Sequence, residues 1–93
     1  FQAQVIRLAR ELGLLVHHHY DSRRSEPGWP DLAMVDARPG PGTLWLIECK
    51  TAKGKLTHAQ EIWLRSLDGK VVCADVWRPA DMEAVMQTLR EKA

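Results

Sequence analysis

The sequence predicts an α/β domain whose elements follow the order α-β-β-β-α-β-α. Apolar residues recur at helical spacing at both ends of the chain, apolar runs typical of strands lie between them, and breaks containing glycine or proline separate these segments. With 93 residues, the chain has the length of one domain with a modest core. We therefore expect residues 1–93 to form a single domain.

The first part of the chain begins with an amphipathic helix. Within residues 1–12, apolar side chains fall on one face at helical spacing, and Gly13 is well placed to end the helix. Residues 14–20, with the sequence Leu-Leu-Val-His-His-His-Tyr, are predicted to form a strand. The polar segment 21–28 that follows is predicted to be a loop.

Two further strands are predicted in the middle of the chain. Proline can begin a strand but cannot occupy its centre, so the strand after Pro30 is expected to cover residues 31–36. The Arg-Pro-Gly-Pro-Gly segment 38–42 is predicted to be a turn, and residues 43–50 to be the next strand. Because side chains alternate in a strand, the apolar residues on both sides of 43–50 indicate that both faces are largely covered.

The last part of the chain is predicted to contain a helix, a strand and a final helix. Residues 58–68 follow Thr57, a favourable N-cap, and Gln60 stands at the capping-box position. Residues 71–77 are apolar and predicted to be a strand. Pro79 then opens a helix with a continuous apolar stripe, because proline is favoured in the first turn.

The overall composition excludes some function classes. The net charge is only +1, so overall charge does not indicate a nucleic-acid partner. No apolar run approaches the roughly 20 residues of a membrane span, and no secretory signal is visible, although the chain starts at Phe1 rather than methionine. Cys49 and Cys73 lie in apolar runs and are expected to be buried, reduced thiols of a cytoplasmic protein, with a spacing unlike that of zinc ligands.

Two acidic residues and a lysine form the candidate catalytic site. Asp31 stands at the start of one predicted strand, and Glu48 and Lys50 stand two residues apart near the end of the next. Because strand side chains alternate, Glu48 and Lys50 point to the same face, about 7 Å apart along the backbone. Two carboxylates and a lysine on one side of a sheet can hold a divalent cation and bind a phosphate beside it, which is the arrangement needed to hydrolyse a phosphodiester.

The same residues have simpler interpretations. Asp31 could be a turn aspartate that accepts hydrogen bonds from local backbone amides. Glu48 and Lys50 could form an exposed pair at a sheet edge, worth less than about 1 kcal/mol. Gln60 could serve only in the capping box, but it also lies on the helix stripe that faces the sheet, from which it could reach the strand ends.

Basic and aromatic residues flank the candidate site. Arg23 and Arg24 precede the Gly-Trp-Pro-Asp segment, and Lys53 and Lys55 follow the second acid. We expect these four side chains to bind DNA phosphates, although short basic runs are more commonly solvated loop residues. Trp29 could stack on a base or support its loop, and packing is the commoner role of tryptophan.

Three consecutive histidines suggest a metal cluster. On a strand, however, His17 and His19 share one face and His18 points to the other, so the three cannot easily bind one ion. We expect surface or partly packed histidines, one of which could face DNA.

The ordered set of motifs resembles the VRR-NUC family, a branch of the PD-(D/E)XK nuclease superfamily, over nearly the whole chain. The matching segments are Asp21-Ser22-Arg23-Arg24-Ser25, Gly28-Trp29-Pro30-Asp31, Glu48-Cys49-Lys50, Gly54-Lys55-Leu56-Thr57-His58-Ala59-Gln60 and Val76-Trp77-Arg78-Pro79. An acid-X-lysine triplet is common, whereas the ordered set with these spacings is specific.

The resemblance implies a restriction-endonuclease-like core, in which helices flank a mixed central sheet, and Mg²⁺- or Mn²⁺-dependent cleavage of DNA. It implies that Asp31 and Glu48 are metal ligands, with the backbone carbonyl of Cys49 as a third. Lys50 would orient or activate the attacking water and stabilise charge on the phosphate. Gln60 would be the helical glutamine that accompanies the site in this family.

Stand-alone members of this size are similar to viral or bacterial enzymes that act as homodimers on branched DNA such as four-way (Holliday) junctions. The resemblance thus implies a bacterial cell or a virus-infected host cell. The chain departs from the family in its first helix, where a glutamate is usual and this sequence has Gln2 and Gln4. Either that glutamate precedes Phe1 or the metal site is weaker.

Two other functions are also consistent with the sequence. A non-catalytic DNA-binding or assembly module that retains the nuclease fold would account for the missing acid of the first helix. A small metal-binding protein that uses His17 and His19 would lose its metal when these residues are replaced, but not in Asp31→Asn.

Overall fold

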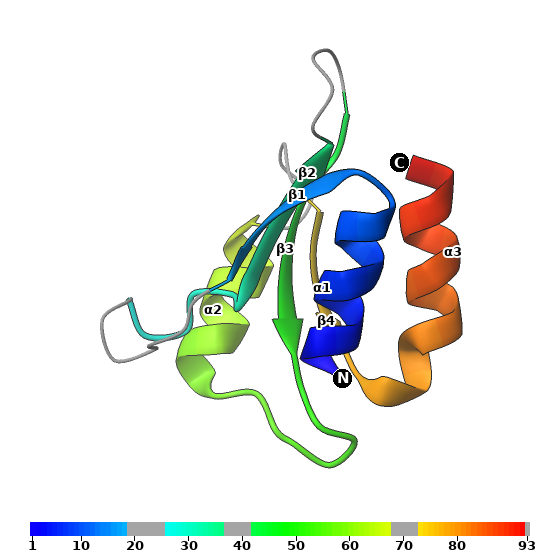
Figure 1. The fold of residues 1–93 in the computed structure, drawn as a ribbon. Coiled ribbons are helices and arrows are strands. Elements are labelled where there is room, and N and C mark those ends of the chain that lie inside the picture. Colours follow the sequence, from blue (N-terminus) through cyan, green and yellow to red (C-terminus); the bar gives the residue numbers. More distant parts are fainter. Residues whose placement is uncertain (19–25, 37–41, 68–72, 93) are drawn as a thin grey trace.

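The computed structural model describes residues 1–18, 26–36, 42–67 and 73–92. Its elements are α1 (Gln2–Glu11), β1 (Leu14–His18), β2 (Leu32–Asp36), β3 (Leu44–Cys49), α2 (His58–Leu67), β4 (Cys73–Trp77), the 3₁₀ helix η2 (Pro79–Asp81) and α3 (Met82–Lys92) (Figure 1). The predicted order is confirmed, and the final helix begins with a 3₁₀ turn at the proline. Residues 21–25 of the expected loop over 21–28, and residues 38–41 of the expected turn over 38–42, lie outside the described residues.

The strands form one mixed sheet in the order β1-β2-β3-β4. β2 is antiparallel to both β1 and β3, whereas β3 and β4 are parallel. Parallel neighbours need a crossover connection, and α2 lies in that connection. The structure therefore has the α/β fold that the sequence predicts, a mixed central sheet flanked by helices.

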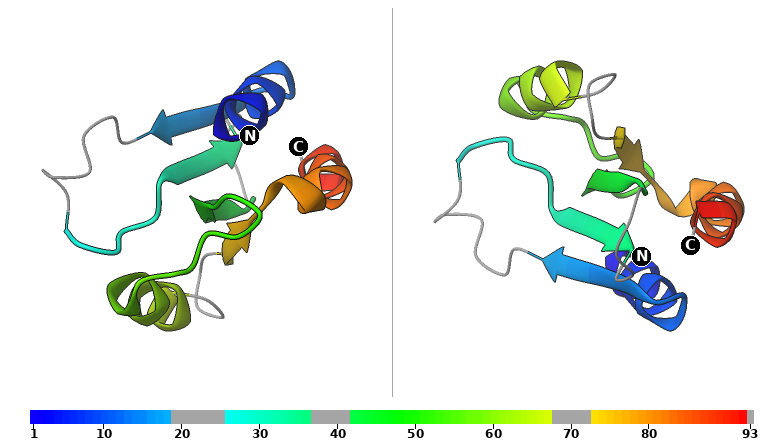
Figure 2. Two further views of the ribbon diagram at one scale, coloured as in Figure 1. Left: turned by 90° about the horizontal axis from the view of Figure 1, so that it is seen from below. Right: turned by 90° about the horizontal axis from the view of Figure 1, so that it is seen from above.

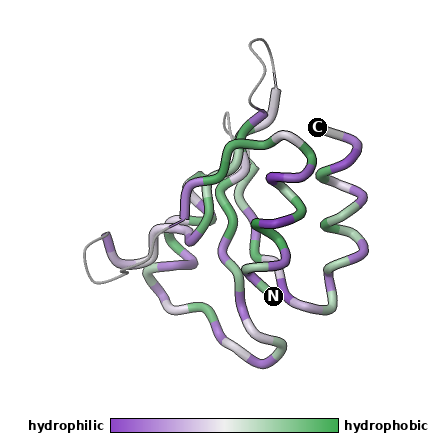
Figure 3. The backbone as a smooth tube through the Cα atoms, viewed as in Figure 1, coloured by the Kyte–Doolittle hydropathy of each residue, from purple (hydrophilic) through white to green (hydrophobic). Residues whose placement is uncertain are grey.

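The helices lie on both sides of the sheet. α1 and α3 cover one face and α2 lies against the other (Figure 2). The core on the α1 and α3 side combines residues of these helices with residues from all four strands. Its buried members are Val5, Ala9, Leu14, Leu32, Met34, Trp45, Ile47, Trp77, Val85 and Leu89. Hydrophobic residues follow the central strands and alternate with polar ones along the helices (Figure 3), which is the pattern of amphipathic helices on a sheet.

The interior position of β3 explains its composition. Trp45 is 1% exposed on one face of the strand and Leu46 is 5% exposed on the other, so both faces are covered as predicted. Outside the area covered by α2, the same sheet face stays open. There Leu15 and its cross-strand partner Val35 are 61% and 38% exposed.

One expectation about the thiols is wrong. Cys49 is partly buried, but Cys73 is exposed. Cys73 is the first residue of β4, which is an edge strand, so fewer neighbours cover it. Among the described residues, no helix is long and apolar enough to cross a membrane.

Candidate active site

The antiparallel pairing of β2 and β3 brings the two acids together. Leu32 at the start of β2 is paired with Ile47 in β3. Continuing this register by one residue places Asp31 opposite Glu48. The Oδ2 atom of Asp31 accepts a hydrogen bond of 3.3 Å from the backbone N–H of Cys49. The hydrogen bond that the structure describes for Asp31 is therefore with the neighbouring strand.

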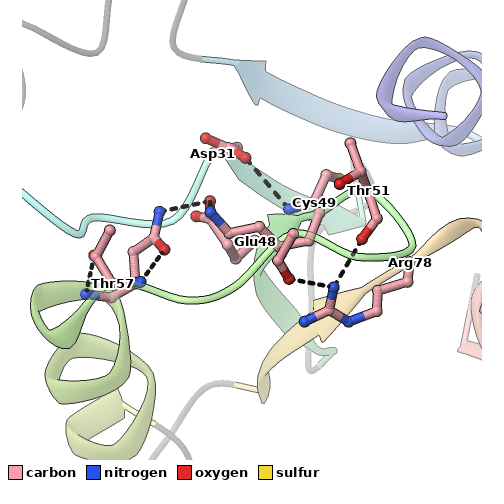
Figure 4. A network of polar contacts seen from close by, with 9 residues as sticks. Asp31, Glu48, Cys49, Thr51, Thr57 and Arg78 are labelled. Carbon is pink, nitrogen blue, oxygen red and sulfur yellow. Dashed lines mark hydrogen bonds and ion pairs between the residues drawn. The ribbon is translucent and has the colours of Figure 1, made fainter.

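Glu48 is buried near the end of β3, with 3% of its surface exposed. Its Oε1 atom accepts a hydrogen bond of 3.0 Å from Nε2 of Gln60 and lies 3.9 Å from Nζ of Lys50 (Figure 4). Its Oε2 atom is also buried and has no hydrogen-bond partner among the described residues. The alternative of an exposed pair at a sheet edge is wrong, because Glu48 is buried on an interior strand.

The surroundings of Glu48 favour its protonated form. Burial, together with the negative charge of Asp31, raises the pKa of Glu48 from 4.5 to about 7, although Lys50 offsets part of this rise. Burial and the same two carboxylates raise the pKa of the Cys49 thiol to about 12. The thiol thus stays protonated at neutral pH. The carboxylates of Asp31 and Glu48 repel each other when both are charged, and a bound cation would offset this repulsion.

A proline leaves the carbonyl of Cys49 without its expected strand partner. Extending the register between β2 and β3 places Pro30 opposite Cys49. The N–H and C=O of one residue in an antiparallel ladder face the same neighbouring strand, and the N–H of Cys49 faces Asp31. Pro30 has no N–H to donate, so it cannot bond this carbonyl, which lies on the side of the two acids.

Gln60 has both of the roles that its sequence position allows. Its backbone N–H donates to Oγ1 of Thr57 over 3.1 Å, and its Oε1 accepts from the backbone N–H of Thr57 over 2.9 Å. This is a capping box. With its oxygen held by the cap, the amide presents its nitrogen to Glu48, so the start of α2 holds a carboxylate on β3.

The Gly-Trp-Pro-Asp segment packs on the first turn of α2. Gly28 has a φ of +89°, and a Cβ atom there would lie 2.4 Å from the backbone carbon of Ala59. Trp29 meets Trp63 edge to face, with ring centroids 5.0 Å apart. Nε1 of Trp63 donates to the carbonyl of Pro27 over 3.1 Å. Trp29 therefore packs against α2, and these contacts fix the segment that carries Asp31 against the helix that carries Gln60.

The turn after β3 is held by Arg78, which follows β4. Its Nη1 atom donates to the carbonyls of Thr51 and Gly54, over 2.7 and 2.6 Å (Figure 4). Lys53 and Lys55 lie exposed in and after this turn. Their expected role at DNA phosphates stays a prediction.

Other predicted residues do not join the site or lie beyond the described ranges. Arg23 and Arg24 lie outside the described residues. His17 is exposed and His18 is partly buried on β1, while His19 also lies outside the described residues. Among the residues described, no group of three or more His, Cys, Asp or Glu side chains could hold a metal ion.

The donor set nevertheless fits a hard divalent cation. Asp31 and Glu48 supply carboxylate oxygens, one of them buried and without a hydrogen-bond partner in the part of the chain that the structure describes. The register of β2 and β3 directs the carbonyl of Cys49 to the same side. Oxygen donors of these kinds suit Mg²⁺ and Mn²⁺. The first turn of α1 contributes no acid. Its Gln2 lines a cavity of about 380 Å³ that Lys50 also lines.

Two residues with a part in the site architecture had no assigned role from sequence. Gly28 lets its segment pack closely against the backbone of α2. Arg78 donates hydrogen bonds to two carbonyls that are far away in the sequence. The glycine-proline pattern could have indicated a close approach. Nothing in the local pattern around Arg78 indicates its target.

Residues 4–80 match the VRR-NUC domain family. The chain belongs to this family. A solved structure named "VRR_NUC domain protein" is 21% identical, has a TM-score of 0.64, and aligns over 96% of this chain and 87% of its own. It shares the fold with this VRR-NUC domain. No curated protein gives a significant match.

VRR-NUC domains are nuclease domains, and the family generally uses divalent metals. The sequence resemblance is thus confirmed at the level of family and fold. A nuclease domain also implies DNA as the partner.

Proposed function

We propose that residues 1–93 form one VRR-NUC nuclease domain that hydrolyses phosphodiester bonds in DNA with Mg²⁺ or Mn²⁺. The observation that carries this proposal is the buried Oε2 atom of Glu48, which has no partner among the described residues and belongs to a carboxyl group beside Asp31. A buried, unpaired carboxylate oxygen is costly in a protein without a ligand. A cation site accounts for its presence.

Each site residue has a role in this proposal. Asp31, Glu48 and the carbonyl of Cys49 would hold the cation. Gln60 holds Oε1 of Glu48 through its amide nitrogen, which leaves Oε2 for the cation. When bound, a divalent cation supplies Lewis acidity that lowers the pKa of water and polarises the phosphate.

Lys50 acts on the substrate side of the site. Its ammonium group lies 3.9 Å from Glu48 and is partly exposed, with 18% of the side-chain surface accessible. It can therefore reach a phosphate while staying beside the carboxylates. We assign it to orienting the attacking water and stabilising charge that develops on the phosphate. Lys53 and Lys55, with Arg23 and Arg24, would bind neighbouring phosphates, a contribution that weakens with salt.

We further propose that the substrate is branched DNA and that the protein acts as a homodimer. The VRR-NUC resemblance supports both points, because stand-alone members of this size are similar to junction-cleaving dimers. Two-fold symmetry would supply two sites for two strands of a four-way junction. Light scattering of the purified protein tests the dimer directly, and a monomer at all concentrations would contradict it.

The proposed activity is tested with a panel of linear duplex, flap, fork and four-way junction DNA. Each substrate is incubated with Mg²⁺, with Mn²⁺ and with EDTA. We expect metal-dependent cleavage that is fastest on a branched substrate. Faster cleavage of the linear duplex would contradict the branched substrate, and no cleavage of any substrate would contradict the nuclease.

A non-catalytic DNA-binding or assembly module is the second candidate. It is favoured by the first turn of α1, which has no acid, and by the lack of a group of three ligating side chains among the described residues. Titration calorimetry separates the two functions. Mn²⁺ binding that Asp31→Asn abolishes supports the nuclease, whereas DNA binding without Mn²⁺ binding supports the module.

A further inference from the structure

Arg78 reaches from the end of β4 to the turn that follows β3. One nitrogen, Nη1, donates to the carbonyls of Thr51 and Gly54 over 2.7 and 2.6 Å. Hydrogen bonds from a charged donor are stronger than those between neutral groups. The two carbonyls stand at the two ends of a short turn, so a single guanidinium fixes the spacing of those ends.

This turn, over residues 51–54, follows Lys50 directly. The backbone N–H of Lys50 donates to the carbonyl of Trp77 over 3.0 Å, and the N–H of Gly54 closes the turn onto the carbonyl of Thr51 over 3.2 Å. A Cβ atom at Gly54 would lie 2.8 Å from Oγ1 of Thr51 and 3.6 Å from Cδ of Lys50. At 3.6 Å the added Cβ atom would make an ordinary van der Waals contact with Lys50, so the turn runs beside the lysine side chain. Because Thr51 follows Lys50 directly, a change in the turn would move the backbone that carries the lysine.

Arg78 is itself fixed in position. Its backbone N–H donates to Oδ2 of Asp81 over 2.9 Å, and the N–H of Asp81 donates to the carbonyl of Arg78 over 2.8 Å. These bonds form the η2 turn that begins α3, and α3 is part of the core through Val85 and Leu89. The guanidinium therefore links the turn after β3 to a rigid part of the molecule.

The described contacts of the Arg78 guanidinium are with the backbone of the turn. It donates to the carbonyls of Thr51 and Gly54, and no bond to a carboxylate is found among its described contacts. Both acceptors lie in the segment between Lys50 and Lys55, so these hydrogen bonds act on the backbone that follows Lys50.

We infer that Arg78 is a positioning residue of the nuclease site, which holds the turn over 51–54 so that Lys50 points at the scissile phosphate. The inference rests on the proposed function, because it gives Lys50 its role. Arg78 does not contact the phosphate itself. Its effect passes through the two carbonyls of the turn.

The first test measures amide hydrogen exchange of the protein without DNA. Arg78→Met keeps the aliphatic stem and removes every donor, so exchange at Gly54 and its neighbours should rise on the order of 10-fold. Arg78→Lys should restore most of the protection, because one ammonium can donate to both carbonyls as Nη1 does. The matched control is Arg90→Met, because Arg90 is an exposed arginine on α3. Exchange in Arg78→Met equal to that of the wild-type protein would overturn the inference.

The second test separates positioning from phosphate binding. In Arg78→Met we expect kcat on branched DNA to fall about 10- to 100-fold, with DNA affinity and its salt dependence unchanged. Arg78→Lys should recover most of kcat. Lower affinity with a shallower salt dependence and unchanged exchange would instead make Arg78 a phosphate contact and overturn the inference.

The inference can still be tested if Arg78→Met does not fold or if the wild-type protein does not cleave DNA. If Arg78→Met fails to fold, Arg78→Gln takes its place. Its amide is a neutral, weaker donor on a side chain two atoms shorter, so this variant should show intermediate exchange. If the wild-type protein cleaves no DNA, the proposed function fails, while hydrogen exchange still decides whether Arg78 fixes the turn.

Discussion

At the scale of single residues, the carboxyl group of Glu48 links stability to pH. In the unfolded chain its pKa is near 4.5, and in the folded protein burial raises the pKa to about 7. Between these values the folded state binds a proton that the unfolded state has lost. The stability of the metal-free protein should therefore fall as the pH rises through this window.

Glu48→Gln should remove this dependence. The glutamine keeps an oxygen for the amide of Gln60 but carries no charge beside Asp31, so we expect it to stabilise the metal-free protein by about 1–2 kcal/mol at pH 8. At pH 4 the gain should vanish. Urea unfolding in EDTA at both pH values measures the difference, with Glu61→Gln on the exposed face of α2 as the control. An equal gain in the free energy of unfolding at both pH values would show that the effect of Glu48→Gln does not depend on protonation of Glu48.

Substitutions of Lys50 and Lys53 should have different effects, one on catalysis and the other on DNA binding. Lys50→Ala is expected to abolish cleavage while folding and DNA binding persist, because we propose that the ammonium beside Glu48 acts on the reacting phosphate. Lys53 is exposed in the turn, so Lys53→Ala should weaken DNA binding and reduce the salt slope by about 1. Cleavage assays and binding titrations over a range of salt measure both effects. Wild-type cleavage by Lys50→Ala would refute its assignment.

At the scale of elements, a glycine fixes the contact between the segment before β2 and the start of α2. Gly28 and Gly13 both have positive φ, +89° and +87°, but only at Gly28 would a Cβ atom meet backbone, within 2.4 Å of Ala59. Gly13→Ala should cost about 1 kcal/mol from its conformation alone. Gly28→Ala should cost at least about 1–3 kcal/mol more, because backbone must move.

The glycine comparison is measured by chemical unfolding of both variants. Gly28→Ala should also lower Mn²⁺ affinity, since it displaces the segment that ends at Asp31, whereas Gly13→Ala should leave that affinity unchanged. Equal destabilisation by the two variants would show that the close approach contributes nothing.

The order of elements could be predicted because each has a local signal. Capping at Thr57, the proline at position 79 and the continuous apolar run of β3 are all recognised within a few residues. The dual role of Gln60 could be narrowed to two possibilities but not resolved. Its outcome depends on how near the end of β3 comes to α2, which no local pattern encodes.

The candidate site was predictable in its acids and lysine but not in its supports. Asp31, Glu48 and Lys50 share strand ends that pairing brings together. By contrast, the bonds of Arg78 span 24 and 27 residues, so they follow from packing of the whole chain. The exposure of Cys73 was missed for a related reason, because sequence does not show which strand lies at an edge.

At the scale of the whole molecule, metal binding should appear as added stability. A ligand that binds only the folded state at 100 times its Kd adds about 2.7 kcal/mol. For a domain of this size that corresponds to a rise in Tm on the order of 10 °C. Thermal unfolding with and without Mn²⁺ measures this rise. Asp31→Asn should abolish it, and a full shift in that variant would place the cation elsewhere.

The position of Pro30 has a consequence for how far the sheet can extend. Strand pairing between β2 and β3 is described as far as Leu32 and Ile47, and the next pair that could exchange ladder bonds would join Pro30 to Cys49. Because proline has no N–H to donate, it ends the hydrogen-bonded pairing of β2 and β3. A residue with an N–H at that position could donate to the carbonyl of Cys49, and that oxygen would then be less available to the proposed cation. The proline thus keeps the sheet open at the place where the chemistry is proposed to occur.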